Sequence, residues 1–330
     1  MTGPFVAAVC SWMRLAVQRR QELPPCEATP RRISALQLPF AVERRGEPVS
    51  GMLDFCLGGK YKPHMQLRGK VAVITGASMG IGEALARLLV ARGATVVLSS
   101  RDLSRVEAAR QRIGTPERTT AIACDVCRRS QLDALVRETV IRHGRIDLWV
   151  NNAGFGLVDS VEKMDMGECR RMFDTNLFAV IEAMQAVIPQ MKRQGGGAIV
   201  NVSSVAGYIA VPYMSAYGAT KHALNCITKA ARLELRASGI QVTNVCPGYV
   251  KTSFSDNAVR GTDDLGVPGS VKHGITPDRV ARAVLNAYAQ RKREIVVPWR
   301  DRVTIGLYRW LPGLFEAGML RLMKPRTPSQ

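Results

Sequence analysis

The sequence predicts an α/β fold in which a single doubly wound parallel sheet of about seven strands carries helices on both faces. Three observations indicate this fold class. From residue 70 onward, short apolar segments alternate with longer segments of helical periodicity. The short segments are apolar at consecutive positions, as in strands that are buried on both faces. The first of them runs through a glycine-rich turn into a helix, which is the repeating unit of such sheets.

Each element is expected from its own pattern. The strands are expected at residues 71–75, 95–99, 120–124, 146–152, 197–204, 240–248 and 294–298. The first helix covers "IGEALARLLVARG" and ends at Gly93, because glycine is favoured just past the last turn of a helix. Further helices are expected in "SRVEAARQRI" and "SQLDALVRETVIRHG". Residues 215–235 form another, because apolar residues recur there at three and four positions.

The chain divides into three parts. Residues 1–64 are rich in Arg, Pro and Glu and lack a sustained period, so we predict a poorly ordered extension. A secretory signal is not expected there, because no basic region precedes its short apolar stretch. Translation from Met52 or Met65 is the alternative. Residues 65–298 form the predicted catalytic domain, and residues 299–330 form a basic amphipathic tail.

Composition narrows the class of protein. The chain has 330 residues, is 46% hydrophobic and carries a formal net charge of +19 spread along its length. Such a charge suits anionic cofactors or membrane surfaces. Basic runs interleaved with aromatics are missing, so nucleic acid is not expected as a partner. Eight cysteines without paired spacing favour reduced thiols and a cytoplasmic location. The four histidines stand apart from acidic or cysteine clusters, so no metal site is expected.

Chemistry is expected at the carboxyl ends of the strands, where such sheets bind ligands. The first strand ends in "TGASMGIG", which contains Gly76, Gly80 and Gly82. Glycine permits a positive φ and the close approach of a pyrophosphate, and the N–H groups of the following helix then attract the anion. The turn therefore predicts a nucleotide site, although its spacing differs from G-x-G-x-x-G.

Five motifs occur in a fixed order. They are "TGASMGIG", "NNAG" at 151–154, Ser204, "YGATK" at 217–221 and "PGYVKT" at 247–252. This set resembles that of the classical short-chain dehydrogenase/reductase family, over about residues 66–298. The resemblance implies a Rossmann-type fold and a nicotinamide cofactor. It also implies four catalytic residues, which are Asn176, Ser204, Tyr217 and Lys221.

Each of these four has an expected role. Tyr217 would be the general acid or base, and its phenol normally titrates near 10. Lys221, one helical turn on, would lower that pKa, and the resemblance implies that it also binds the nicotinamide ribose. Ser204 is implied to donate to the substrate carbonyl, whereas a turn role is expected for the neighbouring Ser203. Asn176 is implied to hold a water against the lysine, and an asparagine on a helix surface is the alternative.

The resemblance also implies the cofactor contacts. Asp125 would contact the adenine ring, with a solvated turn aspartate as the alternative, and Thr252 would bond the carboxamide. The predicted cofactor-binding residues are Gly76, Ser78, Gly80, Ile81, Gly82, Ser100, Arg101, Asp125, Val126, Asn152, Ala153, Gly154, Lys221, Pro247, Gly248 and Thr252.

The end of the second strand predicts the choice of cofactor. An NAD site places a carboxylate there, which binds both ribose hydroxyls. Here Ser100 occupies that position and Arg101 follows, a pair that suits a 2′-phosphate. We therefore expect NADP(H) rather than NAD(H). Met79 weakens this expectation, because some NADP enzymes carry a second basic residue at its position.

The substrate is expected to be a small hydrophobic carbonyl or alcohol. The predicted substrate-binding residues are Ser204, Tyr208, Met214 and Tyr217, and further apolar candidates are Phe155, Ile209 and Val211. Apolar side chains favour such a substrate over a sugar, although these residues could equally belong to the core. The segment from Tyr249 to Ile275 is glycine-rich with mixed charge, as in a mobile lid.

The tail interleaves basic and large apolar residues between 302 and 325, and Pro312 is expected to divide it into two short helices. Its charges exclude a spanning segment. Peripheral membrane contact is one interpretation; covering of the pocket and packing between subunits are the others.

The leading function is an NADP(H)-dependent oxidoreductase. A 3-oxoacyl carrier protein reductase is the narrower alternative, and a non-catalytic nucleotide-sensing scaffold is the alternative from another class. A homo-oligomer is expected by resemblance, either a dimer or a tetramer. The expected location is the cytoplasm, with association to membranes through the tail as an option.

Overall fold

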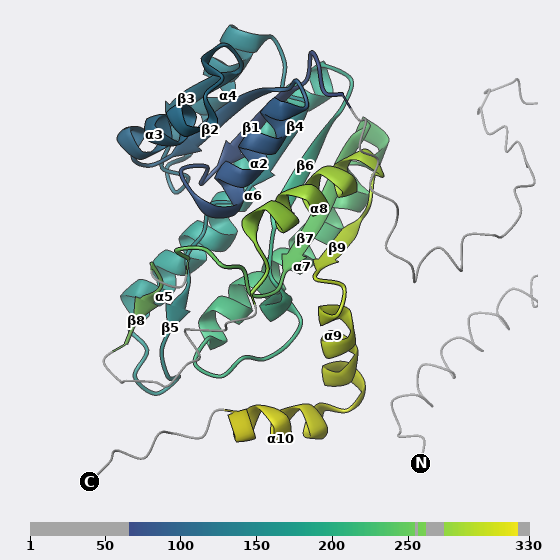
Figure 1. Ribbon diagram of the computed structural model, residues 1–330. Helices are drawn as coiled ribbons and strands as arrows, with labels where there is room; N and C mark the ends of the chain where they lie inside the picture. The colour runs from purple at the N-terminus through teal and green to yellow at the C-terminus, as the bar shows by residue number, and fades with distance from the viewer. Residues whose placement is uncertain (1–65, 255–256, 262–273, 323–330) are drawn as a thin grey trace, which may run out of the picture. The chain divides into compact units, whose positions relative to one another are not determined.

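The computed structural model describes residues 66–254, 257–261 and 274–322 (Figure 1). The predicted extension at 1–64 and the central part of the predicted lid, residues 262–273, lie outside the described residues. All described residues belong to one compact unit of the chain.

Seven strands form one sheet, and every neighbouring pair in it is parallel. The strands are β1 (Val71–Thr75), β2 (Thr95–Ser100), β3 (Thr119–Ala123), β4 (Leu148–Asn151), β6 (Gly197–Val202), β7 (Ile240–Pro247) and β9 (Glu294–Val297). Their order is β3-β2-β1-β4-β6-β7-β9, so the direction of winding reverses between β1 and β4. The predicted doubly wound sheet is confirmed, and its ligand crevice is expected at that reversal.

Helices cover both faces of this sheet (Figure 1). They are α2 (Gly80–Ala91), α3 (Leu103–Ile113), α4 (Arg129–His143), α5 (Met166–Phe173), α6 (Ala179–Arg193), α7 (Ser215–Glu234) and α8 (Pro277–Ala289). One apolar cluster joins α2, α3 and α8 to the sheet, and a second joins α4, α6 and α7 to it. Strands with a helix layer on each side are buried twice, which explains their continuous apolar runs.

The ends of the elements differ from prediction by one or two residues. The strand predicted at 197–204 ends at Val202, because Ser204 turns out of the sheet and caps a short 3₁₀ turn, Val205–Gly207. The first helix stops as predicted before Gly93, whose φ of 87° is left-handed and whose N–H bonds the carbonyl of Val90.

A small second sheet was not predicted. It pairs β5 (Leu157–Val158) with β8 (Val259–Arg260) in parallel. Two-residue strands carry too little alternation to be read from a sequence. The pairing ties the segment after β4 to the segment after β7, and Leu157 and Val259 of these strands pack in the cluster that contains Tyr217.

The tail forms two helices, α9 (Asp301–Trp310) and α10 (Pro312–Leu322). The predicted division at Pro312 is confirmed. Phe315 of α10 is buried in a cluster with Val205 and Ile209, so the inner face of the tail packs on the loop that follows β6. In the described part of the chain, no helix has the length and apolar content needed to cross a bilayer.

Candidate active site

The glycine-rich turn after β1 needs its glycines for two reasons. Gly76 and Gly80 have φ values of 64° and 60°, which strain most other residues. An ideal Cβ on Gly76 would lie 2.8 Å from the Cα of Ala153, and one on Gly82 would lie 2.6 Å from the carbonyl oxygen of Gly76. Side chains at these positions would push the backbone apart and destroy the turn.

Asn152 braces the same turn from the end of β4. Its Nδ2 donates to the carbonyl oxygens of Thr75 and Gly76, at 3.0 and 2.9 Å. The Thr75 hydroxyl in turn accepts from the N–H groups of Asn152 and Ala153. The predicted residues of "TGASMGIG" and "NNAG" therefore meet where the sheet reverses.

The turn fits a dinucleotide phosphate. Met79 precedes α2 with an extended backbone and makes no side-chain cap, so the first N–H groups of α2 are left to a ligand or solvent. Thr252, from the loop after β7, closes on the turn, with its Cγ2 3.2 Å from an ideal Cβ on Gly80. Ser78 and Ile81 flank the turn, both partly exposed.

Helix α7 buries both members of the predicted pair, Tyr217 and Lys221. The Lys221 ammonium lies 5.7 Å from the centre of the Tyr217 ring and donates to the carbonyl oxygen of Val202 at 3.0 Å. It is also 3.9 Å from an ideal Cβ on Gly154, which brings the "NNAG" segment beside the pair.

Burial governs the protonation of this pair. It raises the pKa of Tyr217 to about 12, and the hydrogen bond with Ser204 acts in the opposite direction. It lowers the pKa of Lys221 to about 8. The predicted lowering of the Tyr217 pKa is therefore wrong for this geometry, because desolvation of the phenolate dominates.

The two serines after β6 have different surroundings. Ser204 lies beside the Tyr217 phenol and lowers its pKa. Its hydroxyl accepts from the Ala206 N–H at 3.1 Å and donates to the Pro247 carbonyl at 3.5 Å. Ser203 is buried, and its hydroxyl donates to the backbone carbonyl of Lys221 at 3.3 Å. Only Ser204 faces the phenol, and Ser203 supports α7.

Asn176 lies in a π-helical turn, Asp174–Phe178, between α5 and α6. Such turns insert a residue into a helix and recur at functional sites. The side chain is fully buried. Its Oδ1 accepts from the Phe155 N–H at 3.1 Å, and its Nδ2 donates to the Phe155 carbonyl at 2.9 Å and the Thr220 hydroxyl at 3.4 Å. The surface alternative is therefore wrong, and the water-holding role stays a prediction.

Arg101 follows the last residue of β2, and its side chain is exposed. The Ser100 hydroxyl donates to the Asp102 carbonyl oxygen at 2.9 Å, and the Asp102 carboxylate caps α3 through the Arg105 N–H at 3.1 Å. Asp102 is the first carboxylate after the strand, and it is engaged in that cap.

Sequence reasoning missed Arg112. This side chain of α3 donates to the Ser78 carbonyl oxygen at 3.1 Å and pairs with Glu83 at 2.9 Å. It brings a guanidinium to the glycine-rich turn from 34 residues away. Helical periodicity marks it only as a solvent-facing position, so its contact depends on the tertiary fold.

The other predicted cofactor residues also lie at the carboxyl edge of the sheet. Val126 is buried, whereas Asp125 is partly exposed and bonds the N–H of Cys127 in its own turn. This geometry agrees with the turn alternative and leaves the adenine contact a prediction. Pro247 ends β7, and Gly248 bonds the Val297 carbonyl oxygen and abuts Asp301 of α9.

An apolar wall stands beside Tyr217. Met214, Phe155 and Val211 pack in its cluster, and their contact with a substrate stays a prediction. Phe254 joins them, with its ring centre 5.7 Å from that of Tyr217 and the two planes at 60°. Sequence reasoning placed Phe254 only within a long loop.

Tyr208 packs in a neighbouring cluster, to which Val211 of the wall also belongs. Its hydroxyl bonds the Glu294 carboxylate, and the Lys229 ammonium sits 4.9 Å from its ring centre. It packs in the cluster that holds Phe315 of the tail. The predicted substrate contact of Tyr208 is therefore not supported, because its polar end is held by β9.

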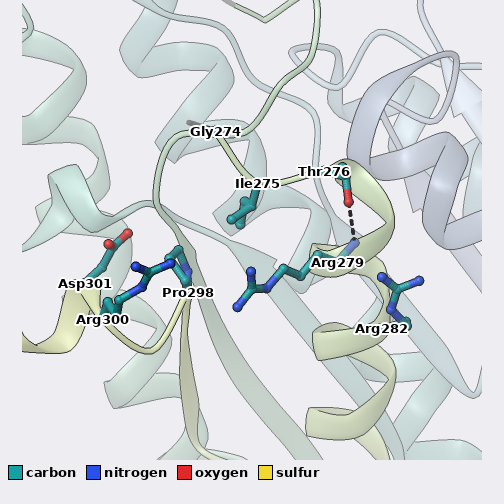
Figure 2. Close-up of a pocket in the computed structure, with 8 residues that line it drawn as sticks. All are labelled: Gly274, Ile275, Thr276, Arg279, Arg282, Pro298, Arg300 and Asp301. Atoms are coloured by element: carbon teal, nitrogen blue, oxygen red, sulfur yellow. Dashed lines mark hydrogen bonds between the residues drawn. The ribbon is translucent and has the colours of Figure 1, made fainter. Parts of the chain in front are cut away.

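A separate pocket of about 520 Å³ lies where α8 and α9 begin. Figure 2 shows its lining, which is Gly274, Ile275, Thr276, Arg279, Arg282, Pro298, Arg300 and Asp301. It contains no residue of the Tyr217 site, so its size says nothing about the chemistry there.

Comparisons with known proteins agree with this geometry. A model of the short chain dehydrogenase family matches residues 70–263. The chain is 34% identical over 280 residues to dehydrogenase/reductase SDR family member 7B of Danio rerio, covering 82% of this chain and 89% of the relative.

Two solved structures share the fold. A short-chain dehydrogenase/reductase of Burkholderia phymatum in complex with NAD has a TM-score of 0.69 at 26% identity, covering 80% of this chain and 99% of that one. The 3-ketoacyl-(acyl-carrier-protein) reductase of Brucella melitensis complexed with NADH has a TM-score of 0.63 at 29% identity, covering 70% and 98%.

Proposed function

The chain belongs to the short-chain dehydrogenase family of oxidoreductases, and we propose that it transfers hydride between NADP(H) and a hydrophobic carbonyl or alcohol. The observation that carries this proposal is the position of the Ser204 hydroxyl beside the buried Tyr217 phenol, whose pKa it lowers, next to an apolar wall. Two hydroxyl groups that converge on one point can bind a single carbonyl oxygen. The wall offers apolar contact to the rest of such a substrate.

When bound, the nicotinamide supplies or accepts the hydride. In the direction of reduction, the carbonyl oxygen accepts a hydrogen bond from Ser204 and then a proton from Tyr217 Oη. A phenol with a pKa of about 12 is protonated at neutral pH, which suits an acid. Lys221, with a pKa of about 8, is mostly charged at pH 7 and stabilises the phenolate left after the transfer.

Tyr217→Phe tests the proposal. It removes one hydroxyl and keeps the ring that packs on Phe254. We expect turnover of the best carbonyl found in an NADPH oxidation screen to fall by about 10²–10⁴-fold, with unchanged cofactor binding and melting temperature. Steroid, retinoid, fatty-acyl and acyl-thioester carbonyls form the screen. Turnover that survives the substitution would remove Tyr217 from the mechanism.

The preference for NADP(H) is supported by the end of β2. Ser100 and Arg101 stand there, and the nearest carboxylate, Asp102, is engaged in capping α3. A guanidinium can hold a 2′-phosphate with paired hydrogen bonds. Two similar structures are complexes with NAD and NADH, so the support for NADP(H) comes from Ser100 and Arg101 of this chain.

Arg101→Asp tests that preference. Loss of charge-assisted hydrogen bonds should weaken NADPH binding by about 10–100-fold and leave NADH binding unchanged or tighter. Arg137→Asp is the matched control, because it makes the same charge change on an exposed position of α4. Equal losses in both variants would assign the effect to net charge alone.

A 3-oxoacyl carrier protein reductase is the second candidate. It is favoured by the similarity to the Brucella melitensis reductase and by a net charge of +19, which suits an acidic carrier. Comparing an acyl thioester on the carrier with the same acyl group on a short thiol separates the candidates. Faster turnover of the carrier-bound form would favour it.

The cytoplasmic location and the homo-oligomer remain part of the proposal. Light scattering of the full chain measures the mass of the oligomer and so distinguishes a dimer from a tetramer.

A further inference from the structure

Exposed large hydrophobic side chains gather in the last described segment. Among the described residues there are fifteen, and seven of them lie between residues 299 and 320. The seven are Trp299, Val303, Leu307, Trp310, Leu311, Leu314 and Leu320. Scattered exposed residues need no explanation, but such a concentration marks an interaction surface.

Helix α9 has two apolar faces. Ile305 and Tyr308 pack on the core cluster of Phe315. Val303, Leu307 and Trp310 recur at i, i+4 and i+7, which places them on the opposite side of the helix at about 100° per residue. Trp310 is 80% exposed. A helix with one packed and one bare apolar face has a surface still to be covered.

Helix α10 and the turn before α9 carry further exposed apolar side chains. Phe315 is buried and meets the Tyr308 ring edge-on at 5.1 Å, which fixes α10 against α9. Leu314 and Leu320 stay exposed, and so does Trp299, at 67%, four residues before Val303. The bare side chains are thus presented by anchored helices rather than by a loose tail.

Arginines border this surface. At about 100° per residue, Arg302 and Arg309 lie on one side of the exposed apolar face of α9, and Arg300 lies on the other side. Arg300 also lines the pocket of about 520 Å³, together with Arg279 and Arg282 of α8 (Figure 2). Residues 299–330 contain six basic and two acidic residues, a net charge of +4.

We propose that α9, α10 and the turn at Trp299 form a docking surface for an anionic lipid bilayer. Tryptophan and leucine side chains enter the interface, and the arginines bind lipid phosphates at its edge, as in helices that lie in the membrane plane. The pocket, which is lined by three arginines and one carboxylate, Asp301, offers room for one headgroup phosphate.

A second copy of the chain is the less favourable occupant. In a two-fold contact the same patch faces itself, so its basic border would face the basic border of the other copy. Anionic lipid complements both the apolar and the basic parts of the surface.

Flotation of the full chain with vesicles tests this proposal. We expect binding to phosphatidylcholine vesicles that contain about 30 mol% phosphatidylserine, little binding to pure phosphatidylcholine, and weakening in about 1 M salt. The double variant Trp299→Ser/Trp310→Ser should lower the bound fraction about tenfold or more. Arg300→Gln should lower it less and reduce the salt dependence.

The matched control is Ile141→Ser/Leu233→Ser, which removes two side chains of similar exposure, 75% and 74%, from α4 and α7. It should bind vesicles like the original chain. All variants should keep turnover of a water-soluble carbonyl, which reports folding. Absence of vesicle binding by the original chain, or equal losses in the control, overturns the proposal. A drop in oligomer mass with the tryptophan variant alone, without vesicle binding by the original chain, would assign the surface to contact between copies.

Discussion

Helices α7 and α9 are both amphipathic, and each carries an aromatic side chain and a cationic side chain close together in the sequence. In α7, Tyr217 and Lys221 are buried. In α9, Trp310 is exposed and follows the exposed Arg309. Burial raises the pKa of Tyr217 and lowers the pKa of Lys221, so it favours the neutral form of both groups. The exposed groups of α9 keep contact with water. The comparison teaches that burial, rather than residue type, separates a pair suited to proton transfer from one suited to surface binding.

The largest expected effect comes from exchanging the cation in each helix. Lys221→Met removes a buried ammonium, its charge near Tyr217 and its bond to Val202. We expect kcat/KM to fall by about 10²–10⁴-fold. Arg309→Met on α9 should change it less than about twofold. Steady-state kinetics with one carbonyl checks both, and similar losses would break the comparison.

The next effect tests which serine serves the α7 pair. Ser204→Ala removes the hydroxyl that lies beside the Tyr217 phenol, and we expect kcat to fall by about 10–100-fold. Ser203→Ala removes only the bond to the Lys221 carbonyl. It should keep kcat within a few-fold and lower the free energy of unfolding by about 0.5–1.5 kcal/mol. A larger kinetic loss at Ser203 would reverse the assignment.

A smaller effect compares the two helices in stability. The Thr228 hydroxyl in α7 accepts from the Asn201 side chain at 2.9 Å within the core. Thr228→Val leaves that amide poorly partnered and should cost about 1–3 kcal/mol. Thr304→Val on α9 makes the same exchange at a partly exposed position and should stay within about 0.5 kcal/mol. Urea unfolding of both variants measures the difference, and equal values would contradict it.

The smallest effect is a dependence of stability on pH. The pKa of Lys221 is about 8 in the folded chain, below its ordinary value of 10.5. The free energy of unfolding therefore increases as the pH rises from about 8 to 10.5, because the unfolded chain binds more protons than the folded chain in this range. The gain is lost as the pH falls back through about 8. Between pH 7 and pH 8.5, the melting temperature of the original chain should rise relative to that of Lys221→Met by about 2–3 °C. A constant difference would contradict the buried position of the ammonium.

Most of the sheet could be predicted from sequence, because strands buried on both faces leave unbroken apolar runs. The turn at Gly76 and Gly80 was predictable for a similar reason, since positive φ restricts the residue types allowed. The break at Pro312 follows from the missing N–H of proline. Each of these signals is local to a few residues.

What could not be predicted depends on groups far apart in the chain. Tyr208 was predicted to contact the substrate, but its hydroxyl bonds Glu294, which is 86 residues away in the sequence and is indicated by no local pattern. Arg112 reaches Ser78 only through the packing of α3 on the turn. The pKa of Tyr217 was predicted with the wrong sign, because the extent of its burial is a property of the assembled fold.

The π-helical turn at Asp174–Phe178 has a consequence for insertions and deletions. Before it, α5 sends Cys169 and Met172 into the cluster of Tyr217, and after it, α6 sends Ala183 and Val187 into the cluster under the sheet. Deleting one residue there would restore a regular helix and rotate one half about 100° against the other. The number of residues in this turn is therefore fixed. Natural variants should exchange its residues without inserting or deleting any.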